Sequence, residues 1–258
     1  MLGFASKRIL QGWARRLGYE IERIRPSLDP IDPFELAVQL LLARQRSFFF
    51  LQIGANDGVS DDPLRAMILK YHLEGILVEP QPEAFKRLVQ NYRDEPQLKL
   101  ENVAISRNNG TTTMYIPASN MGGADLLSSF DRDVLAQRLS SAEIREIEVQ
   151  TSSLASILER NGNRKIDLLQ VDTEGYDFEI LKMVDFSRWA PSIINFEHIN
   201  LTDDDYRQCL ELLAAHGYRT AIRGIDTLGI HESLLERTSS APNESIPVAG
   251  QEDRNIAG

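Results

Sequence analysis

Short apolar runs recur along residues 47–231, and the stretches between them follow a helical period. The runs FFFLQI, GILVEP, IDLLQV and SIINFE are rich in Val, Ile, Leu and Phe, as are strands that are buried on both faces. Helices are predicted at residues 63–71 and 82–92, each with proline at its first position. Their apolar stripes comprise Leu64, Met67, Ile68 and Tyr71 in the first helix, and Phe85, Leu88, Val89 and Tyr92 in the second. This alternation predicts an α/β fold with a parallel sheet and right-handed crossovers.

Further strands are predicted in LKLENVAIS and, after a turn at NNG, in TTTMYIP. Residues 118–145 are polar and show only a short helical run near 134–139. This stretch is interpreted either as a lid or substrate loop or as a plain surface excursion. Helices are expected at 34–45, 154–160, from 176 and at 202–216, and YRTAIRG with TLGIH is expected to form a closing hairpin.

The pattern divides the chain into three segments. Residues 1–46 form an N-terminal extension, with a basic, amphipathic stretch, the proline-rich linker PSLDPIDP and a helix. Residues 1–25 mix Lys and Arg with large apolar side chains, so we expect either peripheral contact with anionic lipid or packing on the domain or on a partner. Residues 47–236 form the main domain, and the tail 237–258 is expected to be disordered.

Composition narrows the classes of partner. The 258 residues, 42% of them hydrophobic, suffice for one main domain. With 28 Lys and Arg against 38 Asp and Glu, the formal charge of -10 lacks the basic surface typical of nucleic-acid binding. Cys209 is the only cysteine, which favours a reducing, cytoplasmic location, with the basic first segment able to touch the inner face of the membrane. No apolar run approaches the about 18 residues of a membrane span.

The first predicted strand ends in a loop that suits the close approach of a ligand. Gly54 and Gly58 flank Ala55-Asn56-Asp57, and glycine lets a ligand reach backbone amides. The second strand ends in Glu79-Pro80, with Glu79 placed 79 − 58 = 21 residues after Gly58. That spacing suits a carboxylate that accepts both hydroxyls of a ribose. Because GANDG lacks the G-x-G-x-x-G pattern of dinucleotide folds, nicotinamide and flavin chemistry are disfavoured.

Acidic residues and a histidine follow the next two central strands. IDLLQV leads into Asp172-Thr173-Glu174, and SIINFE leads into Glu197-His198. If they meet at one sheet edge, these groups can orient an alcohol and remove its proton. We expect Asp172 or His198 to be the base, with Glu174 and Glu197 positioning the alcohol. The structural alternatives are a helix cap for Asp172, a helix-dipole contact for Glu174 and an ordinary hydrogen bond for His198. A divalent cation held by Asp172 and nearby carboxylates is a further alternative that no spacing establishes.

The order of these motifs resembles the FkbM family of S-adenosylmethionine-dependent methyltransferases. The likeness covers residues 48–231 and rests on IGANDG, LVEPQP followed by NY, ENVAIS, IDLLQVDTEGYDFEIL and INFEH. It implies a Rossmann-like class I methyltransferase fold, with a mostly parallel seven-stranded sheet, helices on both faces and an antiparallel terminal hairpin. It also implies O-methylation of a hydroxyl in a sugar, a glycan or a related small molecule.

The resemblance implies roles for single residues. Those expected around the cofactor are Gly54, Asn56 and Gly58 at its methionine portion, Glu79 and Pro80 at its ribose, Asn102, Ala104 and Ile105 at its adenine, and Asp172 with Glu174 beside its methyl group. Many members carry an acid where this chain has Gln52, so the contact with the cofactor's amino group is expected to be weaker or to pass to Asp57. The alternative is a cofactor-binding or partner-binding module of the same fold that lacks catalytic activity.

Overall fold

The structure is a computed structural model that describes residues 31–45, 47–118, 128–130, 132–136 and 144–236. The expectations of lipid contact through residues 1–25 and of a disordered tail at 237–258 lie outside the described residues. Most of the 118–145 excursion lies outside them too. Among the helices that the structure describes, none combines the length and the apolar character of a membrane span.

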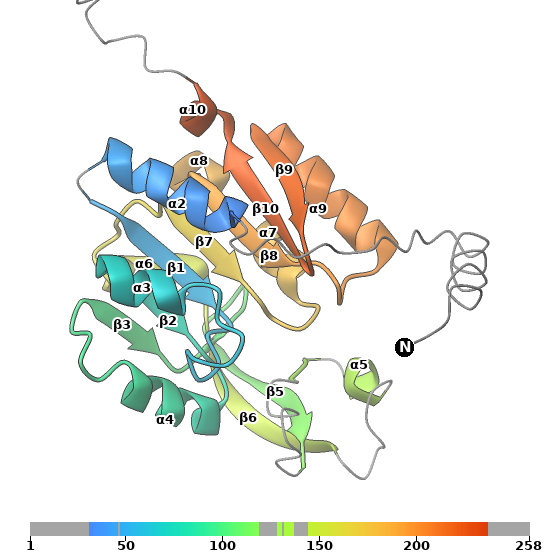
Figure 1. The fold of residues 1–258 in the computed structure, drawn as a ribbon. Coiled ribbons are helices and arrows are strands. Elements are labelled where there is room, and N and C mark those ends of the chain that lie inside the picture. The colour runs from blue at the N-terminus through green and yellow to red at the C-terminus, as the bar shows by residue number, and fades with distance from the viewer. Residues whose placement is uncertain (1–30, 46, 119–127, 131, 137–143, 237–258) are drawn as a thin grey trace, which may run out of the picture.

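A seven-stranded sheet in the order β3-β2-β1-β7-β8-β10-β9 forms the centre of the domain (Figure 1). Its strands are β1 (Phe49–Ile53), β2 (Glu74–Val78), β3 (Leu98–Glu101), β7 (Leu168–Val171), β8 (Ile193–Glu197), β9 (Tyr218–Arg223) and β10 (Asp226–His231). The first five strands in this order pair in parallel, and β10 runs antiparallel to both of its neighbours. The expected sheet with its antiparallel terminal hairpin is therefore confirmed.

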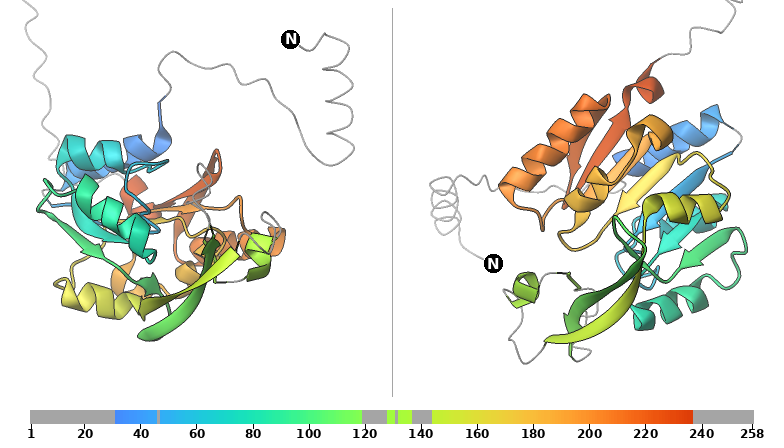
Figure 2. Two further views of the ribbon diagram at one scale, coloured as in Figure 1. Left: turned by 90° about the horizontal axis from the view of Figure 1, so that it is seen from below. Right: turned by 180° about the vertical axis from the view of Figure 1, so that it is seen from behind.

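Helices cover both faces of this sheet (Figures 1 and 2). On one face lie α2 (Pro33–Arg44), α3 (Arg65–Tyr71) and α4 (Pro82–Asn91), with the short α10 (Glu232–Leu235); on the other lie α6 (Leu154–Arg160), α7 (Asp177–Lys182), α8 (Phe186–Trp189) and α9 (Asp203–Ala215). Side chains of a strand alternate between faces, so Phe50 joins the core under α2 while Leu51 and Ile53 join the core under α6. Burial on both faces explains the unbroken apolar runs.

A second, three-stranded sheet is absent from the sequence predictions. It has the order β4-β6-β5, with β4 (Ala104–Ile105), β5 (Gly110–Pro117) and β6 (Ile144–Ser152), and projects from the carboxyl edge of the main sheet (Figure 1). The prediction of one strand in LKLENVAIS is wrong, because the run is divided between β3 in the main sheet and β4 in the second. β6 carries many charged side chains, and only Val149 and Ser152 of its residues are buried, so it lacks the signal of a core strand.

Several helix details also differ from the predictions. α3 begins at Arg65 rather than at Pro63, since the Asp62 carboxylate accepts hydrogen bonds from the backbone nitrogens that open the helix. Pro82 does open α4, but Val89 is 43% exposed instead of buried. The run expected near 134–139 is observed as α5 (Arg132–Ala136), and residues 137–139 lie outside the described part of the chain.

Gly54 lies where the loop after β1 contacts the loop after β7. Its φ is +82°, and a Cβ added there would lie 1.7 Å from the carbonyl oxygen of Asp172. Both the left-handed backbone and this contact demand glycine. The loop after β1 and the loop after β7 can therefore meet only while residue 54 has no side chain.

Gly54→Ala is expected to lower the free energy of unfolding by more than about 3 kcal/mol, because a fixed backbone atom occupies the space of the new methyl group. Gly162→Ala is the matched control, since Gly162 has φ +92° but nothing within 4 Å of an added Cβ. It carries only the strain of a left-handed residue, about 1–2 kcal/mol. Denaturant unfolding measures both variants, and equal losses would contradict the steric explanation.

Candidate active site

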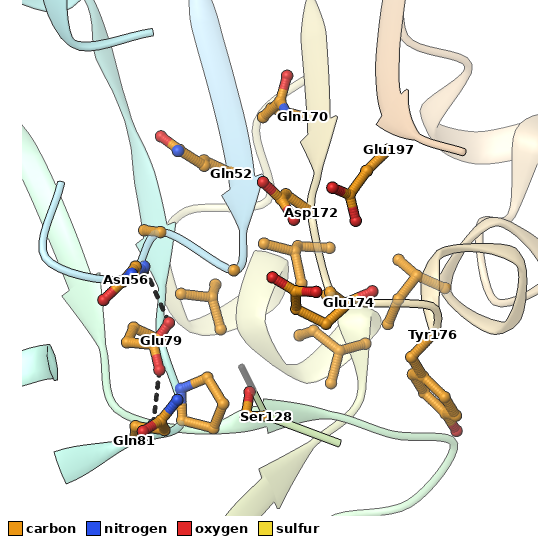
Figure 3. Close-up of a pocket in the computed structure, with 18 of the residues that line it drawn as sticks. Gln52, Asn56, Glu79, Gln81, Ser128, Gln170, Asp172, Glu174, Tyr176 and Glu197 are labelled. Carbon is orange, nitrogen blue, oxygen red and sulfur yellow. Dashed lines mark hydrogen bonds between the residues drawn. The ribbon is translucent and has the colours of Figure 1, made fainter. Parts of the chain in front are cut away.

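The carboxyl ends of β1, β2, β7 and β8 surround a cavity of ≈ 500 Å³, a volume typical of small-molecule sites (Figure 3). Parallel strands deliver their following loops to one edge of the sheet, which is why these loops converge. The second sheet, residues 128–130 and the β9–β10 turn complete the wall. The predicted site residues that line the cavity are Gln52, Gly54, Asn56, Glu79, Pro80, Ala104, Ile105, Asp172, Glu174 and Glu197.

Glu79 is fixed at the end of β2 by two backbone amides. The nitrogen of Asn56 donates to its Oε2 at 2.9 Å, and the nitrogen of Gln81 donates to its Oε1 at 2.7 Å (Figure 3). Its side chain is buried, and that burial raises its pKa to about 7. Each carboxylate oxygen can accept more than one hydrogen bond, so both retain capacity for a hydroxyl. This geometry suits a ligand with two neighbouring hydroxyls.

An apolar wall lies beside Glu79. Ile53, Val78, Val103, Ala104 and Ile105 line this part of the cavity. Asn102 does not line it; the amide of Asn102 donates to the carbonyl oxygens of Glu79 (2.8 Å) and Pro80 (3.1 Å) and so holds the chain after β2 in place. Of the segment predicted to face the adenine, Ala104 and Ile105 line the cavity, whereas Asn102 only holds the neighbouring chain in place.

Carboxyl groups gather at the opposite end of the cavity. Asp172 and Glu197 point toward one another from neighbouring strands, and Glu174 lies close by (Figure 3). Burial raises the pKa of Asp172 to about 9, helped by the charges of Glu197, Asp177 and Glu174. Burial and the charge of Glu174 raise the pKa of Glu197 to about 7. A group of acids with raised pKa values can hold protons, hydroxyl groups or a cation at this place.

Neighbouring side chains hold these acids in position. The amide of Asn200 donates to Oε2 of Glu197 (2.6 Å) and to Oε2 of Glu174 (3.0 Å), which bridges the two carboxylates. Arg223 donates to Asp226 at 2.8 Å and binds Asp32, the N-cap of α2, through two hydrogen bonds of 2.8 Å. The outer end of the cavity is thereby tied to α2.

Besides Asn102, three further predicted site residues lie outside the cavity lining. The ring of His198 stacks on Tyr206, with centroids 4.8 Å apart, and its Nδ1 lies 3.1 Å from Oγ1 of Thr227. The Asp57 carboxylate accepts hydrogen bonds from Val59 and Ser60 within its own turn. The structure therefore favours structural roles for His198 and Asp57 over contact with a ligand.

Gly58 is the third of these residues. A Cβ at Gly58 would lie 2.4 Å from the Tyr92 ring and 2.6 Å from Leu88. The glycine thus lets the loop after β1 pack on α4, and its φ of +69° adds a second reason for its identity.

Sequence reasoning missed several lining residues. Asp62 hydrogen-bonds to Gln52, Asp226 joins the acids from the turn of the hairpin, and Phe130 packs edge-on against Tyr176 with ring centroids 5.0 Å apart. Asp62 stands ten residues from its partner, and Asp226 more than 50 residues from Asp172, so no local spacing relates them. In the sequence, Asp62 and Asp226 are recognisable only as acidic residues in or beside a loop.

Within the ranges that the structure describes, no group of three or more His, Cys, Asp or Glu side chains has an arrangement able to hold a metal ion. The Asn200 amide donates to Glu174 and Glu197, and burial raises the pKa values of Asp172 and Glu197.

Asp172 should make the protein less stable as pH rises. The folded state keeps the Asp172 proton up to about pH 9, whereas an unfolded chain releases it near pH 3.8, so unfolding releases a proton throughout this window. Asp172→Asn is expected to flatten the decline by up to about 1.4 kcal/mol per pH unit. The free energies of unfolding of both proteins at about pH 5.5 and 8.5 measure the effect.

Glu83→Gln supplies the control for this titration. Glu83 is exposed, and its hydrogen bond with Lys86 lowers its pKa, so it is ionised in both states above pH 5. Its substitution should leave the pH dependence unchanged. A pH profile of Asp172→Asn that parallels the wild type would contradict the raised pKa.

A family model described as the methyltransferase FkbM domain matches residues 52–220. Among solved structures, the chain is similar to the methyltransferase FkbM from Methylobacillus flagellatus KT, with 13% identity and a TM-score of 0.48, over 72% of this chain and 44% of that one. It is also similar to the O-methyltransferase from Bacillus cereus in complex with SAH, with 11% identity and a TM-score of 0.40, over 89% of this chain and 92% of that one. The chain thus spans less than half of the first of these proteins. No curated protein matches the chain.

Proposed function

Because the chain belongs to the FkbM family of methyltransferases, we propose that it transfers the methyl group of S-adenosylmethionine to a hydroxyl oxygen of a sugar, a glycan or a related small molecule. The observation that carries this proposal is a single cavity with two different ends. One end holds a carboxylate fixed by backbone amides, at Glu79, and the other holds the acids Asp172, Glu174 and Glu197.

The lining fits an adenosyl donor. Glu79 would accept the ribose hydroxyls, and the wall of Ile53, Val78 and Ile105 would pack on the adenine. Buried Oδ1 of Asn56 has no hydrogen-bond partner among the described residues, which leaves a polar atom for the methionine portion. The bound donor supplies a methyl group that its sulfonium already activates, so the protein's task is to position the acceptor and to take its proton.

The acids would perform that task. An alcohol loses its proton as the new bond forms, and a general base works best with a pKa near the working pH. We assign this role to Glu197 rather than to the expected Asp172 or His198, because its pKa of about 7 meets the condition. Asp172, with its pKa of about 9, keeps its proton at neutral pH and can donate a hydrogen bond. Asn200 positions Glu197 and Glu174 through its amide.

The acids and the aromatic pair at their end of the cavity suit an acceptor molecule that is neutral and rich in hydroxyl groups. Carboxylates accept hydrogen bonds from hydroxyl groups, and the Tyr176–Phe130 pair offers apolar surface for a sugar ring. Among the described residues that line the cavity, Arg223 is the one cation, and its hydrogen bonds go to Asp32 and Asp226. An acceptor with phosphate or carboxylate groups would meet negative charge without a partner.

Glu79→Gln is expected to weaken binding of S-adenosylhomocysteine by about tenfold or more, because it replaces a charged acceptor of hydrogen bonds and turns an amide donor toward a backbone N–H. Isothermal titration calorimetry measures the affinity. Glu83→Gln, an exposed site on α4, should bind like the wild type. Unchanged affinity in Glu79→Gln would contradict the ribose role.

Glu197→Gln is expected to lower the rate of methyl transfer by about 100-fold or more, the usual contribution of a general base, while affinity for S-adenosylhomocysteine stays within a few fold. The assay incubates the protein with methyl-labelled donor and a cell glycan extract. A wild type that binds the donor but transfers no label would favour the binding-only alternative that the departure at Gln52 suggests. A parallel reaction with excess chelator tests the divalent-cation alternative, which predicts loss of transfer.

A further inference from the structure

Gln52 presents an unused acceptor to the cavity. The side chain is 2% exposed, lies on β1 and lines the cavity wall. Its Nε2 donates to Oδ1 of Asp62 at 3.2 Å, whereas its Oε1 has no hydrogen-bond partner in the described ranges. A buried carbonyl oxygen without a donor is costly, so a ligand that donates a hydrogen bond would stabilise this arrangement.

Asp62 is fixed through one oxygen and nearly free at the other. Its Oδ1 accepts hydrogen bonds from Gln52 and from the backbone nitrogens of Leu64 (2.8 Å) and Arg65 (3.3 Å), which anchors the carboxyl group at the start of α3. Its Oδ2 receives only a long hydrogen bond, 3.4 Å, from the hydroxyl of Tyr92. This second oxygen therefore retains most of its capacity for a further donor.

No cation in the described part of the chain neutralises Asp62 through a salt bridge. The guanidinium of Arg65, three residues along the chain, donates to the carbonyl oxygen of Gly58 at 3.0 Å and lies over the Tyr92 ring. Burial raises the pKa of Asp62, as expected for a carboxylate that lacks a positive partner. A ligand with a positive group would give the carboxylate the partner that it lacks.

We propose that Asp62, oriented by Gln52, binds the ammonium group of the amino-acid portion of the methyl donor. An ammonium has three N–H donors and no acceptor, which matches the open oxygen of Asp62 and the unpaired Oε1 of Gln52. Both residues line the same cavity as Gly54 and Asn56. The inference rests on the proposed function, and it assigns this contact to Asp62 rather than to Asp57, whose carboxylate accepts hydrogen bonds within its own turn.

The test compares two ligands that differ at the amino-acid end. S-adenosylhomocysteine carries the ammonium, and 5′-methylthioadenosine lacks it. Asp62→Asn keeps an oxygen that can accept from the backbone nitrogens of Leu64 and Arg65, while it removes the charge and replaces Oδ2 by an NH2 group that donates. Calorimetry should show about a tenfold or greater loss of affinity for S-adenosylhomocysteine and a change below twofold for 5′-methylthioadenosine.

Two further variants sharpen the result. Glu83→Gln changes an exposed acid on α4 outside the cavity lining and should bind both ligands like the wild type. Gln52→Glu combined with Asp62→Asn moves the charge across the hydrogen bond and should recover affinity for S-adenosylhomocysteine relative to Asp62→Asn alone.

The outcomes separate this inference from the proposed function. An Asp62→Asn protein that loses both ligands equally, or neither, would overturn the ammonium site while the wild type still binds the donor. A wild type that binds neither ligand would instead overturn the proposed function.

Discussion

The close contact between the loops after β1 and β7 sets the geometry of the whole site. The backbone nitrogen of Asp172 donates to the carbonyl oxygen of Ile53 at 2.9 Å, and Gly54 lies directly against the carbonyl of Asp172. β1 and β7 are parallel neighbours in register, so this contact continues their ladder past the ends of the strands. It brings the glycine loop after β1 and Asp172, the first acid after β7, into one cavity.

The electrostatics of the cavity follow from that contact. Several carboxyl groups share a partly buried space, and desolvation together with their mutual repulsion raises the pKa of Asp172 to about 9 and that of Glu197 to about 7. A positively charged ligand lowers the cost of ionising such acids, so its binding would be coupled to the release of protons.

Runs of apolar residues were enough to predict the main sheet, because strands such as IDLLQV are buried on both faces and read the same in any fold of this class. β6 was not predictable in this way, since its stability comes from pairing with β5 and its surface stays charged. The site was predictable where a residue follows a strand directly, as at Glu79 and Asp172. Asp62 was not, because its role depends on a hydrogen bond to Gln52 that only the folded loop creates.

The alternation of side chains along the central strands explains why buried polar residues accompany the acids. Gln52, Gln170 and Asn195 occupy matched positions on β1, β7 and β8, and two residues further along the last two strands stand Asp172 and Glu197. Side chains of a strand alternate between the two faces of the sheet, so Gln170 lies on the same face as Asp172, and Asn195 on the same face as Glu197. The side chains of Ile53, Val171 and Phe196 point to the other face and join the apolar core. The side-chain amide of Asn195 donates to Oε1 of Gln170 at 2.9 Å and also to Oδ2 of Asp226. The row of amides therefore forms a polar layer next to the acids. Apolar residues at these positions would leave the acids of the site without such polar neighbours, and the row of amides is therefore part of the site although it lies within the sheet.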